Sequence, residues 1–303
     1  MLWKNMPELP EVETVARGLQ RELAGRRILS ITLGKTDFID NPEALENELP
    51  GRTITRVHRY GKFLLLRLGA AEGTKTSDGE AALLVHLGMT GLLMPKSVRE
   101  LQAKHTHVVM LLDDGRELRY VDPRRFGRMA YLAGEMLSGE LQRFGADPLE
   151  VGLEEFARRI QGRKARIKAL LLDQSVLRGV GNIYADESLW KAKIHPAQLG
   201  RRLKQAEVKE LHTALQKILQ KAILLRGSSI SDFLDAEGLP GEYQQHHRAY
   251  GREGKPCFRC KTAIRRVIVA GRSSYFCPNC QRGPRWQKRA GGLKRRAMGK
   301  AKK

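Results

Sequence analysis

The sequence has few cysteines and no long hydrophobic run. Its four cysteines all lie between residues 257 and 280, and no apolar stretch approaches the roughly 18 residues that a membrane span requires. The N-terminus lacks the charged, apolar and small-residue segments of a signal peptide in that order. We therefore expect a cytoplasmic protein without a membrane anchor. With 303 residues, the chain is long enough for two domains with buried cores.

Acidic residues are scarce relative to basic ones. The chain has 33 aspartates and glutamates against 55 lysines and arginines, which gives a net charge of +22. Ten of the basic residues and no acid lie between Arg282 and Lys303, and +12 remains without them. The tail is typical of a disordered segment that adds salt-sensitive attraction to phosphates. The excess in the rest of the chain makes a polyanion the first partner to consider.

The first 130 residues combine one helix with several short strands. Apolar residues recur at helical spacing from Val12 to Leu23, and Gly25 follows where a helix would stop. Pro7 therefore lies at the N-terminal end of an amphipathic helix. The strand-like runs that follow are "ILSITLG", "TITRVHRY", "KFLLLRL", "AALLVHLG", "HVVMLL" and "ELRYVD". This pattern predicts an α+β protein that begins with a β-sandwich or barrel-like domain opened by one helix.

The second half is helical and ends in the cysteine-containing element. The stretch "RFGADPLEVG" indicates a linker, because both periodicities lapse there. Helices are predicted in "LEEFARRIQG", "ARIKALLLDQ" and "NIYADESLWKAKI". A longer helix carries apolar residues on one face from Val208 to Leu225 and ends at Gly227. All four cysteines lie in the last element, between about Tyr250 and Gln281.

The cysteine spacing predicts a zinc site. Two CxxC pairs, separated by 16 residues, can direct four thiolates at one ion; the ligands are Cys257, Cys260, Cys277 and Cys280. The alternative is a pair of disulfides, which a cytosolic chain disfavours. Four thiolates leave no open coordination position, so one structural Zn²⁺ is expected. Arg272 precedes the second pair at the expected hairpin tip, where it is either solvated or suited to phosphate contact.

The segment "GVGNIYADE" has two interpretations. Gly179 and Gly181 allow a tight connection between helices, and Asn182 is then the expected N-cap of the next helix. Alternatively, Asn182 and the free N–H groups at the helix start hold a phosphate.

Two loops carry residues suited to a distorted duplex. "VHLGMTGLL" places His86 and Met89 at the end of an apolar run, and "VDPRRFG" places Arg124 and Phe126 in a turn. Taken singly, Met89 and Phe126 are expected in the core. Together, an apolar wedge, a cation and an aromatic ring could fill the gap left by an extruded base. His105 and His107 alternate on a strand, so metal ligation by this pair is only a weak hypothesis.

The start of the chain raises a chemical question. Glu8 and Glu11 are either solvated acids of a first helical turn or proton-shuttling groups beside Pro7. If Met6 is the initiator and is removed, Pro7 has a free secondary amine, and perturbed amines are established nucleophiles. If Met1 is the start, the Pro7 nitrogen belongs to a tertiary amide and cannot attack.

In combination these motifs resemble the bacterial formamidopyrimidine-DNA glycosylases. "MPELPEVETV", "HLGMTG", "DPRRFG", "GVGNIYADE", "YGREGKPC" and the paired CxxC motifs occur in family order between Met6 and Gln281. The resemblance implies a β-sandwich domain, a helix-two-turn-helix domain and a zinc finger that bind duplex DNA containing oxidised bases or abasic sites. The implied activity is excision of oxidised purines, such as 8-oxoguanine and formamidopyrimidines, followed by β,δ-elimination at the abasic site.

The resemblance also implies residue roles. Pro7 would attack the deoxyribose C1′ and form a Schiff base, Glu8 would protonate the sugar ring oxygen, and Glu11 would support it. Lys62 would act in β-elimination and Arg272 in δ-elimination. Met89, Arg124 and Phe126 would fill the vacated stack. The remaining DNA-contacting positions would be His86, His105, Asn182, Tyr250 and either Arg163 or Lys164.

The resemblance divides the chain into five segments. Residues 1–6 are expected to be an upstream start-site error, 7–143 the catalytic β-sandwich domain, 144–249 the helix-two-turn-helix domain, 250–281 the zinc finger and 282–303 a basic tail. The loop "GAAEGTKTSDGE" is longer than the family usually carries, and "RGSSISDFLDAEGLPGEYQQ" stands where the family has its lesion-capping loop. We expect a monomer associated with the nucleoid.

Three other functions are compatible with parts of the sequence. An endonuclease VIII-like enzyme for oxidised pyrimidines is the nearest, but "PELPEV" rather than "PEGPE" argues against it. If Pro7 is internal, the chain could bind damaged DNA without catalysis. A zinc-ribbon protein for structured RNA is the last alternative, and the sequence has none of the usual single-strand stacking platforms.

Overall fold

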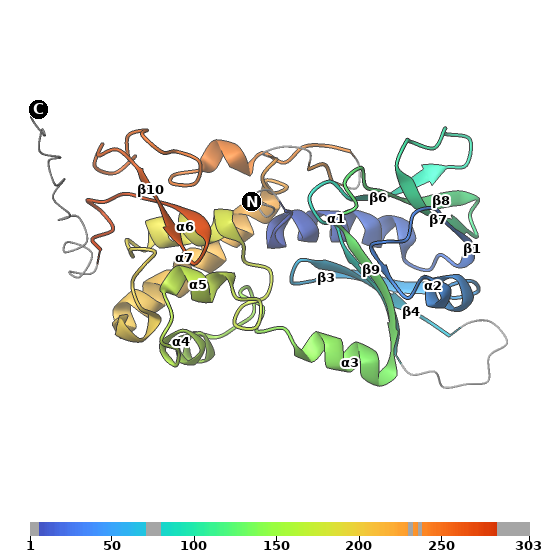
Figure 1. The fold of residues 1–303 in the computed structure, drawn as a ribbon, viewed down its shortest axis with the longest axis horizontal. Coiled ribbons are helices and arrows are strands. Elements are labelled where there is room, and N and C mark those ends of the chain that lie inside the picture. Colours follow the sequence, from blue (N-terminus) through green and yellow to red (C-terminus); the bar gives the residue numbers. More distant parts are fainter. Residues whose placement is uncertain (1–5, 71–79, 230–232, 236–237, 284–303) are drawn as a thin grey trace, which may run out of the picture.

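The computed structural model describes residues 6–70, 80–229, 233–235 and 238–283. Figure 1 shows an elongated molecule with the strands β1 to β9 toward one end, and with the helices α4 to α7 and the hairpin of β10 and β11 toward the other. The expected long loop, part of the expected lesion-capping loop and nearly all of the basic tail lie outside the described residues. Among the described residues, no helix has the length and apolar character needed to cross a membrane.

Helix α1 (Leu9–Leu23) forms where the apolar periodicity predicts it. Pro10 lies in its first turn, where a missing N–H costs nothing. Its buried face includes Val12, Val15 and Leu19, which pack into the core of the β-rich part. The helix ends before Gly25, whose φ of +82° reverses the chain direction.

Two sheets form the predicted sandwich. One has the strand order β1-β7-β8-β6 and the other β2-β9-β5-β4-β3, and all described pairs are antiparallel except β2 with β9. The shared core includes Leu64, Leu66, Val85, Met110 and Leu118. The strands are β1 (Ile28–Leu33), β2 (Ile39–Asp40), β3 (Ile54–Tyr60), β4 (Phe63–Leu68), β5 (Ala81–His86), β6 (Leu92–Ser97), β7 (Thr106–Leu112), β8 (Arg116–Val121) and β9 (Arg128–Ala133).

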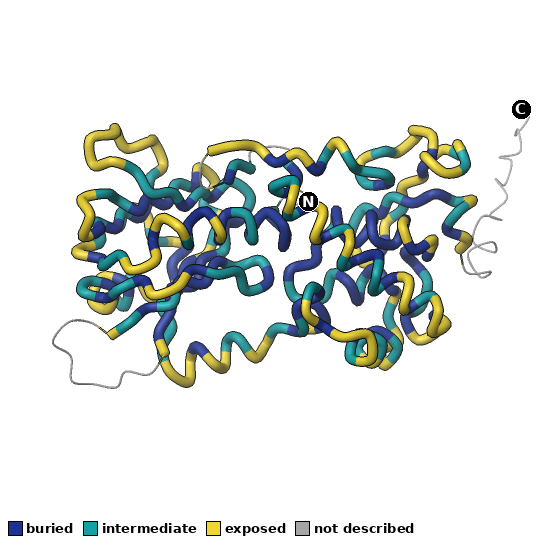
Figure 2. The backbone as a smooth tube through the Cα atoms, turned by 180° about the vertical axis from the view of Figure 1, so that it is seen from behind, coloured by how far each residue is buried: buried dark blue, intermediate teal, exposed yellow. Residues whose placement is uncertain are grey.

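Several elements of this part were not predicted. Strand β6 contains Pro95, which a central strand would not tolerate, but β6 is at a sheet edge and pairs only with β8 among the described strands. The short helices α2 (Pro42–Glu48) and α3 (Gly134–Gln142) each bury one residue, Leu45 and Leu137 respectively. In Figure 2 the segment along the lower edge, which corresponds to α3, consists mostly of exposed and partly buried residues. One buried residue gives too little periodicity for a helix to be recognised.

The helical part contains the four predicted helices. They are α4 (Leu153–Gln161), α5 (Ile167–Leu172), α6 (Asn182–Lys191) and α7 (Gln205–Leu224). Phe156, Tyr184, Leu211 and Leu215 are fully or almost fully buried in their common core. Helix α7 ends at Leu224, one residue earlier than its apolar face extends, and Gly227 follows at a φ of +81°.

The C-terminal ribbon is a two-stranded hairpin. Strands β10 (Arg265–Val269) and β11 (Arg272–Phe276) are antiparallel, and Val269 pairs with Arg272. Ala270 and Gly271 form the connection with φ values of +50° and +73°, as a tight two-residue hairpin turn requires. Arg272 therefore lies at the hairpin tip, as predicted. The ribbon packs through its cysteine region against Trp190 of α6.

Candidate active site and nucleic-acid interface

Glu8 joins the two halves of the molecule. It precedes α1, and its carboxylate accepts hydrogen bonds from the backbone N–H groups of Ile183 at 2.9 Å and Tyr184 at 3.4 Å, in the first turn of α6. Gly181 is the N-cap of α6, so the expectation that Asn182 caps this helix is wrong. A Cβ atom at Gly181 would lie 2.2 Å from the Glu8 Cδ atom. Glycine is needed there because the carboxylate occupies that space.

The same contact occupies two of the N–H groups that the phosphate interpretation of this turn requires. The N–H groups of Ile183 and Tyr184 bind a carboxylate of the protein itself. A helix N-terminus favours an anion, and here Glu8 supplies it.

Burial sets the protonation of Glu8. Only 4% of the residue is exposed, and burial raises its pKa to about 7, with a further rise from the charge of Glu11 and an opposing effect from Lys62. A carboxyl group with such a pKa is present in both protonation states near neutral pH. It is therefore suited to general acid catalysis.

Glu11 lies behind Glu8 at the centre of a hydrogen-bonded cluster. Its Oε2 accepts from the Glu8 N–H at 2.9 Å. Its Oε1 accepts from the Tyr184 hydroxyl at 2.5 Å and from the Ser228 N–H at 2.6 Å. Burial raises the pKa of Glu11, and these bonds oppose the rise. Glu8 and Glu11 are thus buried groups, and the alternative of two solvated acids is wrong.

A small cavity brings the other predicted catalytic residues together. It has a volume of about 60 Å³ and is lined by Glu8, Lys62, Asn182 and Arg272, with Met6, Leu172 and Gly181. Lys62 lies in the turn between β3 and β4, and burial lowers the pKa of its ammonium group, with a smaller contribution from Arg272. Pro7 is buried, and only Glu8 stands between it and the start of α1.

Asp122 organises the two loops expected to enter DNA. Its carboxylate accepts from the Thr90 hydroxyl at 2.6 Å, the Tyr120 hydroxyl at 3.2 Å, and the N–H groups of Arg124 at 3.2 Å and Gly127 at 2.9 Å. Asp122 is fully buried. One carboxylate therefore connects the loop after β5 with the loop before β9.

These loops present side chains to solvent. Phe126 is 42% exposed, and the Arg124 guanidinium lies 4.5 Å from its ring centroid. Met89 is only partly buried. The expectation that Met89 and Phe126 belong to the core is therefore wrong. An exposed aromatic ring stacked with a cation, together with a partly buried methionine in the adjoining loop, is suited to insertion into a duplex.

The histidines occupy different environments. His86 ends β5, accepts from the Gly88 N–H at 3.0 Å, and has its pKa lowered to about 4, chiefly by burial. His105 is exposed at a φ of +74°, whereas His107 is buried with Nε2 3.2 Å from the Asp122 carbonyl oxygen. In the part of the chain that the structure describes, the cysteine cluster is the only group of three or more possible metal ligands.

The remaining predicted contacts are spread along the helical part. Arg163 and Lys164 are both exposed in the connection between α4 and α5, and Arg163 pairs with Asp173 at 3.3 Å. Neither lines the catalytic cavity. Tyr250 lies beside the ribbon, because its ring packs edge-on against Tyr275 of β11 with centroids 5.3 Å apart.

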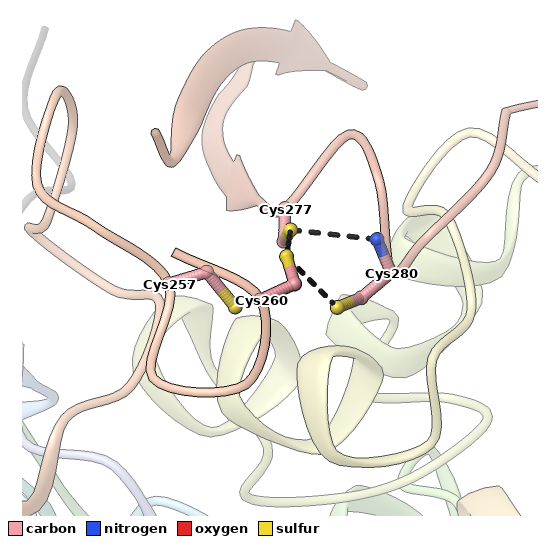
Figure 3. Close-up of side chains that lie close together, drawn as sticks. All are labelled: Cys257, Cys260, Cys277 and Cys280. Atoms are coloured by element: carbon pink, nitrogen blue, oxygen red, sulfur yellow. Dashed lines mark hydrogen bonds between the residues drawn. The ribbon is translucent and has the colours of Figure 1, made fainter. Parts of the chain in front are cut away.

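The four cysteines fit a zinc ion. Figure 3 shows their sulfur atoms converging from two loops, and all four lie within 4.8 Å of one another. Cys260 Sγ lies 3.4 Å from Cys277 Sγ and 3.5 Å from Cys280 Sγ, far beyond the roughly 2.05 Å of a disulfide. Such spacing suits thiolates that share one tetrahedral ion with bonds of about 2.3 Å. The four cysteines therefore fit one structural Zn²⁺, and the disulfide alternative is wrong.

Two buried acids of α6, Asp186 and Glu187, which the sequence patterns did not indicate, hold the ribbon and the segment before it. Asp186 pairs with Lys168 at 2.7 Å, and neither side chain is exposed. Lys168 Nζ also donates to the Ser273 carbonyl at 2.7 Å, and Asp186 accepts from the Tyr275 N–H at 3.0 Å. Burial raises the pKa of Asp186 to about 6. This network fixes the hairpin that carries Arg272.

Glu187 binds the segment that precedes the ribbon and holds it against α6. Its carboxylate accepts from the backbone N–H groups of Arg248, Ala249 and Tyr250 at 2.8 to 3.0 Å. Burial raises its pKa to about 7. The two adjacent acids in "ADESLW", close to the apolar Leu189 and Trp190, could have indicated that the acids are buried. The sequence does not show which backbone N–H groups these acids bind.

The paired sheets, the helical part and the four-cysteine ribbon define the class of helix-two-turn-helix DNA glycosylases with a zinc finger. Three family descriptions match in this order: "Formamidopyrimidine-DNA glycosylase N-terminal domain" at residues 6–129, "Formamidopyrimidine-DNA glycosylase H2TH domain" at 144–234 and "Zinc finger found in FPG and IleRS" at 254–283.

Individual relatives agree with these matches. The formamidopyrimidine-DNA glycosylases of Herpetosiphon aurantiacus and Solibacter usitatus are 45% and 44% identical, over 91% of this chain and 100% of each relative. The Lactococcus lactis Fpg in complex with abasic-site DNA superposes with a TM-score of 0.81 at 34% identity, over 91% of this chain and 100% of that one. The Thermus thermophilus MutM (Fpg) protein superposes with a TM-score of 0.78 at 39% identity, over 92% of this chain and 100% of that one. The chain belongs to the formamidopyrimidine-DNA glycosylase family.

Proposed function

We propose that this protein is a base-excision repair enzyme that removes oxidised purines from duplex DNA and cleaves the resulting abasic site. The observation that carries the proposal is the buried Glu8, with a pKa of about 7, in a cavity that Lys62 and Arg272 also line. Solved relatives are bound to DNA containing formamidopyrimidine-dG, an abasic site or carbocyclic 8-oxoguanine. These lesions define the substrate class.

The proposed chemistry begins at Pro7. Met6 is removed, the free amine attacks the deoxyribose C1′, and Glu8 protonates the sugar ring oxygen as the base leaves. Glu11 supports Glu8 through its hydrogen bond to the Glu8 N–H. The resulting iminium acidifies the C2′ proton, so strand cleavage follows from the same intermediate. Lys62 serves β-elimination and Arg272 serves δ-elimination.

DNA contacts are assigned on the same basis. Met89, Arg124 and Phe126 enter the gap left by the extruded nucleotide, which agrees with the exposure of Phe126 and its stacking with Arg124. The other proposed contacts are those of His86, His105, Asn182, Tyr250 and either Arg163 or Lys164.

The zinc ion supports this arrangement without entering the reaction. When bound, it would hold the two cysteine loops together, and the ribbon then places Arg272 beside the cavity. We further propose the domain limits 7–143, 144–249 and 250–281, a start at Met6, and a monomer in the cytoplasm near the nucleoid.

Borohydride trapping tests the proposal. The purified protein is incubated with an 8-oxoguanine duplex and borohydride, and we expect a covalent adduct together with strand cleavage. Binding without an adduct would support a damaged-DNA-binding protein instead. Preferential trapping on an oxidised-pyrimidine duplex would support the endonuclease VIII-like alternative.

Intact-mass measurement of the native protein tests the start separately. We expect a mass that begins at Pro7. A mass that retains Leu2 to Met6 would contradict the mechanism, because the Pro7 nitrogen would then be an amide.

A further inference from the structure

A chain of polar contacts leads from the catalytic carboxylates to His247. The Tyr184 hydroxyl donates to Glu11 at 2.5 Å and lies 3.5 Å from Ser228 Oγ, which lies 3.1 Å from His247 Nε2. Glu11, Tyr184 and Ser228 are buried, whereas His247 is partly exposed. The chain therefore connects a buried acid with a side chain that reaches the surface.

His247 is surrounded by aromatic and cationic groups. The rings of Tyr243 and Tyr250 pack edge-on against it, with centroids 5.7 and 5.6 Å away. Burial, with the charges of Arg252 and His246, lowers the pKa of His247 to about 4. The imidazole is thus neutral near pH 7, and one ring nitrogen has a lone pair that can accept a proton.

We propose that Tyr184, Ser228 and His247 form a proton relay between Glu11 and solvent. The Glu11 carboxyl gives its proton to the Tyr184 oxygen as the Tyr184 hydroxyl proton passes to Ser228 Oγ and the Ser228 hydroxyl proton passes to His247 Nε2. His247 then releases the proton on its other ring nitrogen to water. Each hydroxyl keeps one proton, and the net change is the loss of one proton from Glu11. The reverse sequence reloads it.

The relay rests on the proposed function, because its effect is exerted on Glu8. The charge of Glu11 raises the pKa of Glu8, so a path that sets the charge of Glu11 also sets how readily Glu8 donates its proton. His247 acts through Glu11 and touches neither substrate nor reacting atoms. It is a positioning residue for the proton rather than a catalytic residue.

A glutamine substitution separates proton transfer from hydrogen bonding. His247→Gln can still accept from or donate to Ser228, but it cannot pass a proton. We expect single-turnover base excision at pH 7 to fall about tenfold, with an altered pH profile and a smaller solvent deuterium isotope effect, while cleavage of a preformed abasic site is retained. His212→Gln is the matched control, because His212 lies in α7 and contacts the Val151 carbonyl oxygen instead, and we expect wild-type rates.

Two further measurements distinguish the relay from a structural role. Ser228→Ala removes the hydroxyl but keeps the N–H that binds Glu11, so it should reproduce the loss seen in His247→Gln, and the double variant should lose no more. Imidazole added to His247→Gly should restore excision. Wild-type rates and pH profile in His247→Gln would overturn the relay. Failure of the wild-type protein to excise any oxidised base would instead overturn the proposed function.

Discussion

The protonation of Glu8 predicts how base excision depends on pH. With a pKa of about 7 in the folded protein, the fraction of Glu8 that carries the acid proton is about 0.9 at pH 6, about 0.5 at pH 7 and about 0.1 at pH 8. The protonated form is the active one, so the contribution of Glu8 is present at low pH and is lost as the pH rises through 7. We expect this contribution to fall about fivefold between pH 7 and pH 8.

The assay must separate Glu8 from the amine of Pro7, which needs to be unprotonated. Single-turnover excision of 8-oxoguanine and single-turnover cleavage of a preformed abasic site both require the amine, whereas the first alone requires the acid. The ratio of the two rates therefore reports Glu8. This ratio should fall about fivefold from pH 7 to pH 8, because the protonated fraction of Glu8 falls by that factor.

Variants sharpen the test. Glu8→Gln should abolish excision while leaving abasic-site cleavage partly intact, and Glu22→Gln, which removes an exposed acid from the same helix, should change neither. Lys62→Met removes a charge that lowers the pKa of Glu8, so the falling limb should move to higher pH. A rate ratio that is constant or rises between pH 6 and pH 8, or excision that survives in Glu8→Gln, would refute the assignment.

Three other perturbations follow from the contacts. In Asp122→Asn, the side-chain amide cannot accept all four hydrogen bonds that the Asp122 carboxylate accepts. We expect a loss of about 2 kcal/mol in unfolding free energy and of about 5 °C in Tm, with weaker binding of lesion DNA. The control Asp37→Asn changes an exposed acid and should bind DNA and melt like the wild type. Lys168→Met leaves Asp186 buried without its cation and should cost about 3–5 kcal/mol in denaturant unfolding, and an unchanged midpoint would contradict the network. Removal of zinc by a chelator, confirmed by metal analysis, should abolish adduct trapping, and full trapping by the zinc-free protein would contradict a supporting role.

The local patterns of the sequence predicted much of the fold. The apolar spacing from Val12 to Leu23 corresponds to α1, and the cysteine spacing corresponds to the ribbon. Elements with few buried residues were missed, since α2 and α3 each bury one side chain. Strand β6 was missed because Pro95 is tolerated only at a sheet edge, and position in a sheet is a tertiary property.

The candidate site was predictable in its residue types but not in its contacts. Glu8 and Ile183 are 175 residues apart in the sequence. No local pattern therefore shows that the Glu8 carboxylate binds the N–H groups at the start of α6. Phe126 was expected in the core on hydrophobicity alone, and its exposure depends on the turn that Asp122 holds. The hydrophobic periodicity of a sequence does not show which distant backbone groups a buried acid binds.

The capping of α6 by Glu8 has a consequence for how the enzyme could be assembled or divided. The first residues of one half and the helix start of the other half together exclude water from this carboxyl group. In separated halves the helical core would lose Leu9 of α1, and Glu8 would become an ordinary glutamate that is ionised at neutral pH. The raised pKa of Glu8 thus depends on the contact between the two halves of the molecule. A substitution that loosens this contact would lower the rate of base excision without changing any reacting group.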